Sequence, residues 1–172
     1  MATSTNTKKR TSTSTLPRVA VNEMGKLPPQ ALELEESVLG ALLIEKDAFA
    51  TIADLLRPES FYSVQHSVIF EAIRSLAAKD APIDILSVVE QLRSSGDLEK
   101  AGGVVYLSEL TRRVASAAHL RYHAQIVAQK STARDLISMA CQIEEKGYDE
   151  TQDIDVLMQE AEAGIFEISQ RA

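Results

Sequence analysis

The chain has 172 residues, of which 45% are hydrophobic and only 5% aromatic, and its formal net charge at pH 7 is −7. This length suits one domain with an appendage, whose core must be built from aliphatic side chains. A single cysteine, Cys141, excludes an internal disulfide and a zinc site made of several thiolates from one chain. No segment approaches the roughly 18 uninterrupted apolar residues of a membrane span, so we expect a cytoplasmic protein without a membrane partner.

The charge is unevenly distributed along the chain. Residues 1–28 hold five basic groups and one acidic group, and the remainder holds 13 basic and 24 acidic groups, giving +4 and −11. Because phosphates repel an acidic surface, the larger part is a poor candidate for binding nucleic acid and a better one for binding basic proteins. Residues 1–27 are rich in Ser, Thr and Lys, and we predict that they form a disordered tail.

Helical periodicity begins at about Glu33, after the pair Pro28-Pro29, and continues to the end of the chain. We predict a globular helical subdomain over residues 28–115. Its helices are expected from about residue 33, then over residues 48–56, 64–79, 85–95 and 105–113. Asp47 and Asp84 are the expected N-caps of the second and fourth helices, and Gly96 the expected stop of the fourth.

The last third, residues 116–172, is predicted to form a long antiparallel helical hairpin. Ser116 is a plausible N-cap, and nothing from Ala117 to Lys146 would break a helix. A heptad-like stripe runs through the first helix at Tyr122, Ile126, Gln129, Ala133, Leu136, Ala140, Ile143 and Gly147. After the acidic turn GYDETQD, a second stripe contains Ile154, Leu157, Ala161, Ile165 and Ile168. The predicted fold class is therefore all-α, a globular helical bundle followed by the hairpin.

These two stripes are the candidate functional feature, because a two-helix hairpin cannot cover both of its apolar faces by itself. It must pack on the globular subdomain, on a second copy or on a partner. We expect the hairpin interface to use Leu136, Ile137, Ala140, Ile143, Leu157, Ala161 and Ile165.

No combination of residues predicts a catalytic, cofactor-binding or metal site. Gly102-Gly103 lacks the lysine and hydroxyl of a phosphate-binding P-loop, so we interpret it as a tight helix junction. His119 and His123 share a helix face, but no glutamate base and no further ligand accompany them, so surface or interface positions are expected. Cys141 lies in an apolar run and is expected to be a small buried residue.

Five blocks occur in an order that is far more specific than any one of them: LPPQALELEESVLGALL, FYSVQHSVIFEAI, PIDILSVVEQL, GDLEKAGGVVYLSEL and SAAHLRYHAQIVAQKSTARDLI. Together they resemble the N-terminal domain of the bacterial replicative DNA helicases of the DnaB family. The resemblance covers roughly residues 28–170.

The resemblance implies a collar of dimers, assembled as a trimer of dimers above six ATPase motors. It also implies docking of the helicase-binding domain of primase and contacts with the helicase loader, at replication forks near the bacterial nucleoid. ATP and Mg would belong to a C-terminal motor domain of the parent protein, as would DNA unwinding. This chain itself is expected to carry no cofactor and no enzymatic activity.

Two alternatives remain open at this point. One is a stand-alone all-α adaptor with the same fold. The other is a nucleic-acid-binding protein that acts through Lys8, Lys9 and Arg10, which would show DNA affinity with a steep salt dependence.

Overall fold

The computed structural model describes residues 25–114 and 116–172, so most of the predicted tail lies outside the described residues. These residues form six α-helices and two short 3-10 helices, with no strand among them. In chain order the elements are α1 (Leu32–Ile44), η1 (Phe49–Thr51), η2 (Pro58–Ser60), α2 (Val64–Ala78), α3 (Ile85–Ser95), α4 (Gly103–Arg113), α5 (Leu120–Tyr148) and α6 (Ile154–Arg171). The all-α prediction is confirmed.

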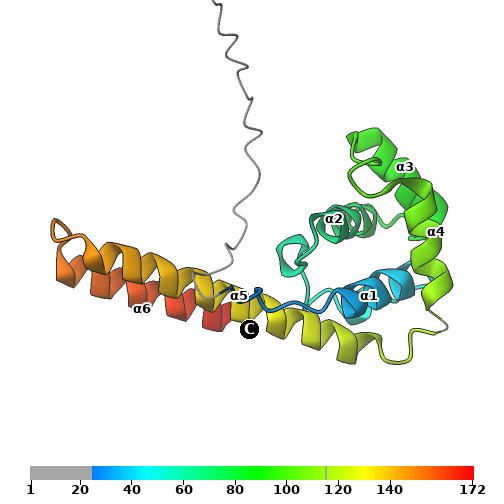
Figure 1. Cartoon of the computed structure of the whole chain (residues 1–172). Helices are drawn as coiled ribbons and strands as arrows, with labels where there is room; N and C mark the ends of the chain where they lie inside the picture. The colour runs from blue at the N-terminus through cyan, green and yellow to red at the C-terminus, as the bar shows by residue number, and fades with distance from the viewer. Residues whose placement is uncertain (1–24, 115) are drawn as a thin grey trace, which may run out of the picture.

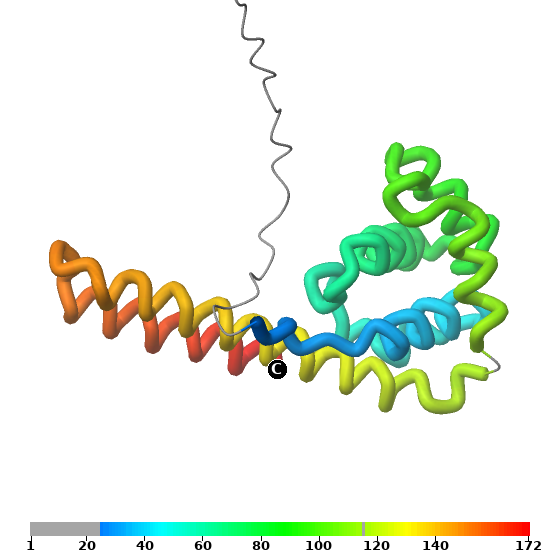
Figure 2. The backbone as a smooth tube through the Cα atoms, in the orientation of Figure 1, coloured from blue at the N-terminus to red at the C-terminus, as the bar shows by residue number. Residues whose placement is uncertain are grey.

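The molecule has a head, made of the elements from α1 to α4, and a hairpin that projects from it (Figure 1). Helix α5 starts beneath the head and continues outward, and α6 returns along its distal half (Figure 2). Both parts therefore share one long helix. No described helix is long and apolar enough to cross a membrane.

Helix α1 lies at the centre of the head and is covered by helices on several sides. Val38 and Leu39 are fully buried in it, and Leu42 is 1% exposed. Every residue from position 38 to position 43 of α1 is buried, and a helix segment that is apolar all round belongs in a core. Across the core, the Phe70 ring packs at centroid distances of 4.9 Å from Phe61 and 5.9 Å from Phe49.

Helices α1 and α4 approach each other closely because Gly40 has no side chain. A Cβ built at Gly40 would lie 2.4 Å from the carbonyl oxygen of Leu110 and 2.6 Å from a methyl group of Val114. Ordinary contacts to a Cβ are about one ångström longer, so only glycine allows this spacing of the two helices. The sequence had not indicated this role.

The predicted helix ends are confirmed where their chemistry is local. Asp84 caps α3, its carboxylate accepting a hydrogen bond of 2.8 Å from the amide of Ser87. Gly96 ends α3 with φ 77°, in the left-handed region that favours glycine. Gly102 and Gly103 have φ 94° and 74° and form a compact junction at the start of α4, as predicted.

The helix predicted over residues 48–56, with Asp47 as its N-cap, is wrong. Asp47 has φ 63° and lies in a turn, and only the 3-10 helix η1 forms beyond it. Ala48, Ile52 and Leu56 are all buried, so their helical spacing was a true sign of burial. Consecutive tight turns place these three side chains in the core without a continuous α-helix.

Candidate interaction surface

The two helices of the hairpin contact each other along a narrow seam. Leu157 and Ile168 of α6 are 6% and 8% exposed. Between them, Gly164 faces Met139 of α5, and a Cβ at Gly164 would lie 1.9 Å from the Met139 methyl group. Gly164 thus leaves room for the Met139 side chain, whereas Gly40 in the head faces a backbone oxygen of the neighbouring helix.

The turn between α5 and α6 is stabilised by its own acidic side chains. Asp149 accepts hydrogen bonds from the amide and the hydroxyl of Thr151, at 3.0 and 2.7 Å, and these bonds lower the pKa of its carboxyl group. Asp153 caps α6 by accepting from the amide of Asp155 at 2.9 Å. Lys146 and Glu160 form an ion pair of 2.5 Å across the two helices.

The first half of α5 packs on the head through a different face of the helix. Its buried positions are Leu120, Ala124, Val127, Ser131 and Arg134. These residues recur every three or four positions, so they form one stripe. The heptad-like stripe predicted from the sequence runs along another face, where Tyr122 is 64% exposed.

Arg134 holds the base of the hairpin to the head. Its guanidinium donates to the carbonyl oxygens of Pro29 at 2.7 Å and Ser60 at 2.8 Å, and it lies 5.6 Å from the centroid of the Tyr62 ring. The side chain is mostly buried, and this burial lowers the pKa of the guanidinium. Closer to the start of α5, Arg121 donates two hydrogen bonds of 3.1 Å to Asp54, which lower the pKa of that carboxyl group.

A buried polar cluster lies inside the head, and the sequence analysis did not predict it. Glu35 is 1% exposed, and its carboxylate accepts from the amide of Tyr62 at 2.6 Å and from Nδ1 of His66 at 2.6 Å. With the proton on Nδ1, Nε2 of His66 accepts from the Tyr106 hydroxyl at 2.6 Å. Burial, followed by the charge of Glu36, raises the pKa of Tyr106 to about 12. The cluster links α1, α2 and α4 by hydrogen bonds, and each of its buried polar groups has a partner. Its role is therefore to stabilise the head.

The seven residues expected at the hairpin interface lie in two places. Leu157 is buried in the seam between α5 and α6, and Ile143 and Ala161 are half-buried. By contrast Leu136, Ile137 and Ile165 are 47%, 38% and 54% exposed, and Ala140 is exposed as well.

Helical periodicity places several exposed apolar residues on one side of the hairpin. Relative to the seam, Leu136 and Ala140 of α5 and Met158 and Ile165 of α6 are each displaced by about 60° to 100° around their helix axes. In two antiparallel helices, residues rotated away from the seam by equal angles in the same sense, each about its own N-to-C axis, lie on the same side of the pair. We call these four residues the hairpin face. They form an apolar surface that the described residues leave uncovered.

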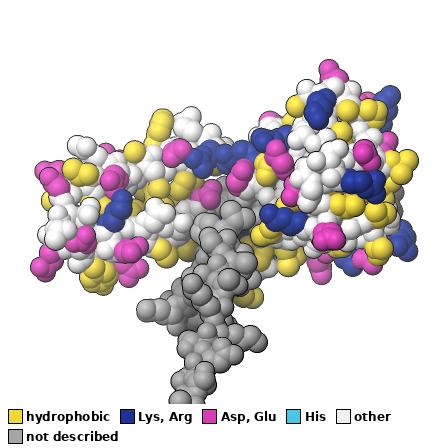
Figure 3. Space-filling model, turned by 90° about the horizontal axis from the view of Figure 1, so that it is seen from above, with side chains coloured by type: hydrophobic (Ala, Val, Ile, Leu, Met, Phe, Trp, Pro, Cys, Tyr) yellow, Lys and Arg dark blue, Asp and Glu magenta, His cyan; other side chains and the backbone are white. Residues whose placement is uncertain are grey.

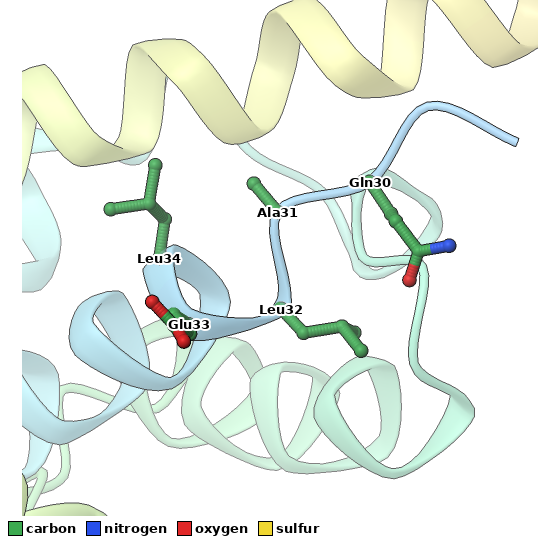
Figure 4. Close-up of a pocket in the computed structure, with 5 residues that line it drawn as sticks. All are labelled: Gln30, Ala31, Leu32, Glu33 and Leu34. Atoms are coloured by element: carbon green, nitrogen blue, oxygen red, sulfur yellow. The ribbon is translucent and has the colours of Figure 1, made fainter. Parts of the chain in front are cut away.

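A second candidate surface is a shallow hollow of about 310 Å³ at the start of α1, lined by residues 30–34. Figure 4 shows Leu34 and Ala31 directed toward α5, while Leu32 points toward another helix of the head. Leu32 is 40% exposed. The hollow therefore combines apolar side chains with the polar Gln30 and Glu33, beside α5 at the base of the hairpin.

Two further sequence-level expectations need correction. Cys141 is exposed rather than buried, because its face of α5 meets neither the head nor α6. Helix α5 begins at Leu120 with His119 at its N-cap, whereas Ser116 caps only a preceding turn through the amide of Ala118. The His119 and His123 rings lie 6.1 Å apart, and no group of three or more metal-binding side chains occurs in the part of the chain that is described.

The fold and these surfaces define an all-α domain with a head and a projecting, apolar-faced hairpin. Residues 27–129 match the family model of the DnaB-like helicase N terminal domain, and the chain belongs to this family.

Curated relatives agree with this assignment. The chain is 46% identical over 147 residues to the replicative DNA helicase DnaB of Rhodothermus marinus, covering 86% of this chain and 16% of that protein. It is 42% identical over 146 residues to the replicative DNA helicase DnaB of Geobacillus stearothermophilus, covering 85% of this chain and 32% of that protein. The chain thus spans only between a sixth and a third of the length of these relatives.

Solved structures show the same fold. The N-terminal domain of DnaB helicase from Mycobacterium tuberculosis superimposes with a TM-score of 0.77 at 35% identity, covering 83% of this chain and 99% of that one. A structure of a DnaB-like replicative helicase and its interactions with primase gives a TM-score of 0.67 at 30% identity, covering 83% of this chain and 32% of that one.

Proposed function

We propose that this chain is the N-terminal collar domain of a replicative DNA helicase, acting in assembly and docking. The observation that carries the proposal is the uncovered hairpin face on a member of this family. Unwinding, with its ATP and Mg, would belong to a motor domain of a longer parent protein in the bacterial cytoplasm. The domain organisation follows the same division: residues 1–27 as a tail, 28–115 as the head and 116–172 as the hairpin.

Self-association is the first role, and hairpins of two copies would pair through the hairpin face and neighbouring residues. Each large aliphatic side chain that becomes fully buried contributes about 1.5–3 kcal/mol. Several such side chains from each copy favour a dimer, and three dimers would complete a hexameric collar. Of the seven residues expected in the interface, Leu136, Ile137, Ala140 and Ile165 are exposed enough to contact a partner directly. Ile143, Leu157 and Ala161 would support the interface by holding α6 against α5.

The test is a double substitution on the hairpin face, Leu136→Glu with Ile165→Glu. We expect it to lower the molar mass measured by light scattering toward that of one chain, with unchanged helical circular dichroism. The matched control is Ser138→Glu with Ala163→Glu, which adds the same two charges at exposed positions on the other side of the hairpin. Equal masses for the two variants would refute the assignment of this face.

Docking of primase, and of the loader, is the second role. It is supported by the similar structure that includes interactions with primase, and the hollow beside α1 offers the exposed side chain of Leu32 for such a contact. Leu32→Glu should weaken binding of a primase helicase-binding domain in calorimetry by about tenfold, the effect of about 1.4 kcal/mol. Leu86→Glu is the control, because Leu86 lies on α3 and is 79% exposed. Equal losses in both variants, or none in either, would rule out the hollow.

A further inference from the structure

The outer part of the hairpin has the highest density of net negative charge in the chain. Residues 135–167, here the distal hairpin, contain ten acidic residues and one basic residue, a net charge of −9. Residues 29–119, which include the head, contain 14 acidic and eight basic residues, a net charge of −6 over almost three times the length. In the view of Figure 3 acidic side chains cluster along the hairpin and basic ones are sparse toward its end.

Much of this charge has no counter-ion among the described residues. Lys146 is already paired with Glu160, and Asp149 and Asp153 are used in the turn and the cap. The carboxylates of Glu144, Glu145 and Glu150 are exposed, and no described cation pairs with them. Apolar side chains stand among them, with Tyr148 81% and Ile154 66% exposed. This end of the hairpin, residues 144–155, is the tip, where two exposed apolar side chains stand among acidic ones.

The opposite composition occurs in the same chain. Residues 1–24 contain Lys8, Lys9, Arg10 and Arg18 against one acidic residue, Glu23, for a net charge of +3. They also contain Leu16, Val19 and Val21, so the segment offers both cations and apolar side chains. The family model starts at residue 27, so this segment lies outside the part that defines the family.

The described chain begins within reach of the tip. Gly25 lies four residues before Pro29, whose carbonyl oxygen is bonded to Arg134 in the middle of α5. Tyr148 follows Arg134 by 14 positions in α5, which corresponds to about 21 Å of helix. Lys8, Lys9 and Arg10 precede Gly25 by 15 to 17 residues, a length of chain that can extend over at most about 50–60 Å. Attachment this close to the site raises the effective concentration of the segment there to about the millimolar range.

We propose that residues 1–24 dock on the tip of the hairpin of their own chain. Lys8, Lys9 and Arg10 face the carboxylates of Glu144, Glu145 and Glu150, and apolar residues of the segment cover Tyr148 and Ile154. The contact screens the negative charge that two hairpins bring together when they associate. It also occupies the basic cluster that would otherwise bind nucleic acid.

The native cysteine provides the test. Cys141 is exposed and seven residues from Tyr148, so a nitroxide attached to it reports on the tip of the intact chain. Paramagnetic broadening of the amide signals of residues 5–15 is measured by NMR on the full chain. We expect these signals to lose at least about half of their intensity at 0.1 M salt and to recover at 1 M, as the Debye length falls from about 10 to about 3 Å.

Matched variants separate a specific contact from general attraction. Glu144→Gln with Glu145→Gln and Glu150→Gln should abolish the broadening. Glu45→Gln with Glu99→Gln and Glu109→Gln removes the same charge from exposed sites on the head and should leave the broadening in place. Circular dichroism shows whether each variant is folded.

Three outcomes would overturn the proposal. They are no broadening in the native chain, equal broadening in the tip variant, and broadening that appears only between a spin-labelled copy and an isotope-labelled copy. Because the contact occupies the basic cluster, duplex DNA should bind more weakly to the native chain and to the head variant than to the tip variant, and equal binding to all three would overturn this part of the proposal. None of these readouts depends on the hairpin face, so self-association can fail or succeed independently.

Discussion

Replacing Gly40 by alanine tests whether the spacing of α1 and α4 controls the stability of the head. The added Cβ would lie 2.4 Å from a backbone oxygen of Leu110, and that oxygen cannot turn away as a flexible side chain can. The two helices must therefore separate by about one ångström, which loosens the packing of the most buried residues. Overpacking of this kind costs about 1–3 kcal/mol, and a backbone obstacle places it near the upper end.

Alanine also has an intrinsic advantage over glycine within a helix, of about 1 kcal/mol. The expected net result for Gly40→Ala is a decrease of about 2 kcal/mol in the free energy of unfolding. Gly147 is the matched control, since it lies in α5 and a Cβ there would have no neighbour within 4 Å. Gly147→Ala should raise the stability of its helix by up to about 1 kcal/mol.

The assay is urea unfolding monitored by helical circular dichroism, with linear extrapolation to water. The two substitutions are chemically identical, so their opposite signs would isolate the effect of packing from that of helix propensity. A Gly40→Ala chain at least as stable as the native one would refute the reasoning and show that α1 and α4 adjust freely.

Two further predictions concern the buried polar groups. Arg134→Met should lower the free energy of unfolding by about 2–4 kcal/mol, because the carbonyl groups of Pro29 and Ser60 lose their donor, and it should speed hydrogen exchange at the base of the hairpin. Equal exchange in the two proteins would show that Arg134 does not hold the hairpin to the head. The pKa of Tyr106 is raised to about 12 from its usual value near 10, so the folded state keeps a proton that the unfolded state releases. Stability should therefore decline as pH rises from about 10 toward about 12, and Tyr106→Phe should remove this part of the decline; an identical pH profile in that variant would contradict the assignment.

The sequence predicted those elements whose limits are set by local chemistry. The Asp84 cap, the Gly96 stop and the Gly102-Gly103 junction each need only neighbouring residues, so their pattern was sufficient. Residues 48–56 show where this reasoning fails, because burial at every fourth residue is compatible with a series of tight turns as well as with a helix. The deciding feature was the positive φ at Asp47, and nothing in its neighbours indicated it.

The hairpin shows a second limit of periodicity. Helix α5 contacts the head with one stripe and α6 with another, so a single repeat could not describe both. The sequence showed the stripe that contains Leu136 and Ala140 and did not show the head-facing stripe. That stripe includes Arg134, a charged residue that a search for apolar periodicity passes over. Glu35 was missed for the same reason, since only the structure shows that His66 and the amide of Tyr62 lie beside it.

Helix α5 runs without a break from the head to the tip of the hairpin. Its helical geometry therefore fixes the rotation of the distal hairpin about the helix axis relative to the head. Each residue turns the helix by about 100°, so one extra residue after Arg134 would rotate the whole distal hairpin by that angle relative to the head. Seven extra residues would bring it back to within about 20° and lengthen the arm by about 10 Å. Insertions of about two helical turns would therefore lengthen the hairpin and leave the hairpin face on the same side relative to the head. Insertions of other lengths would turn the hairpin face to another side.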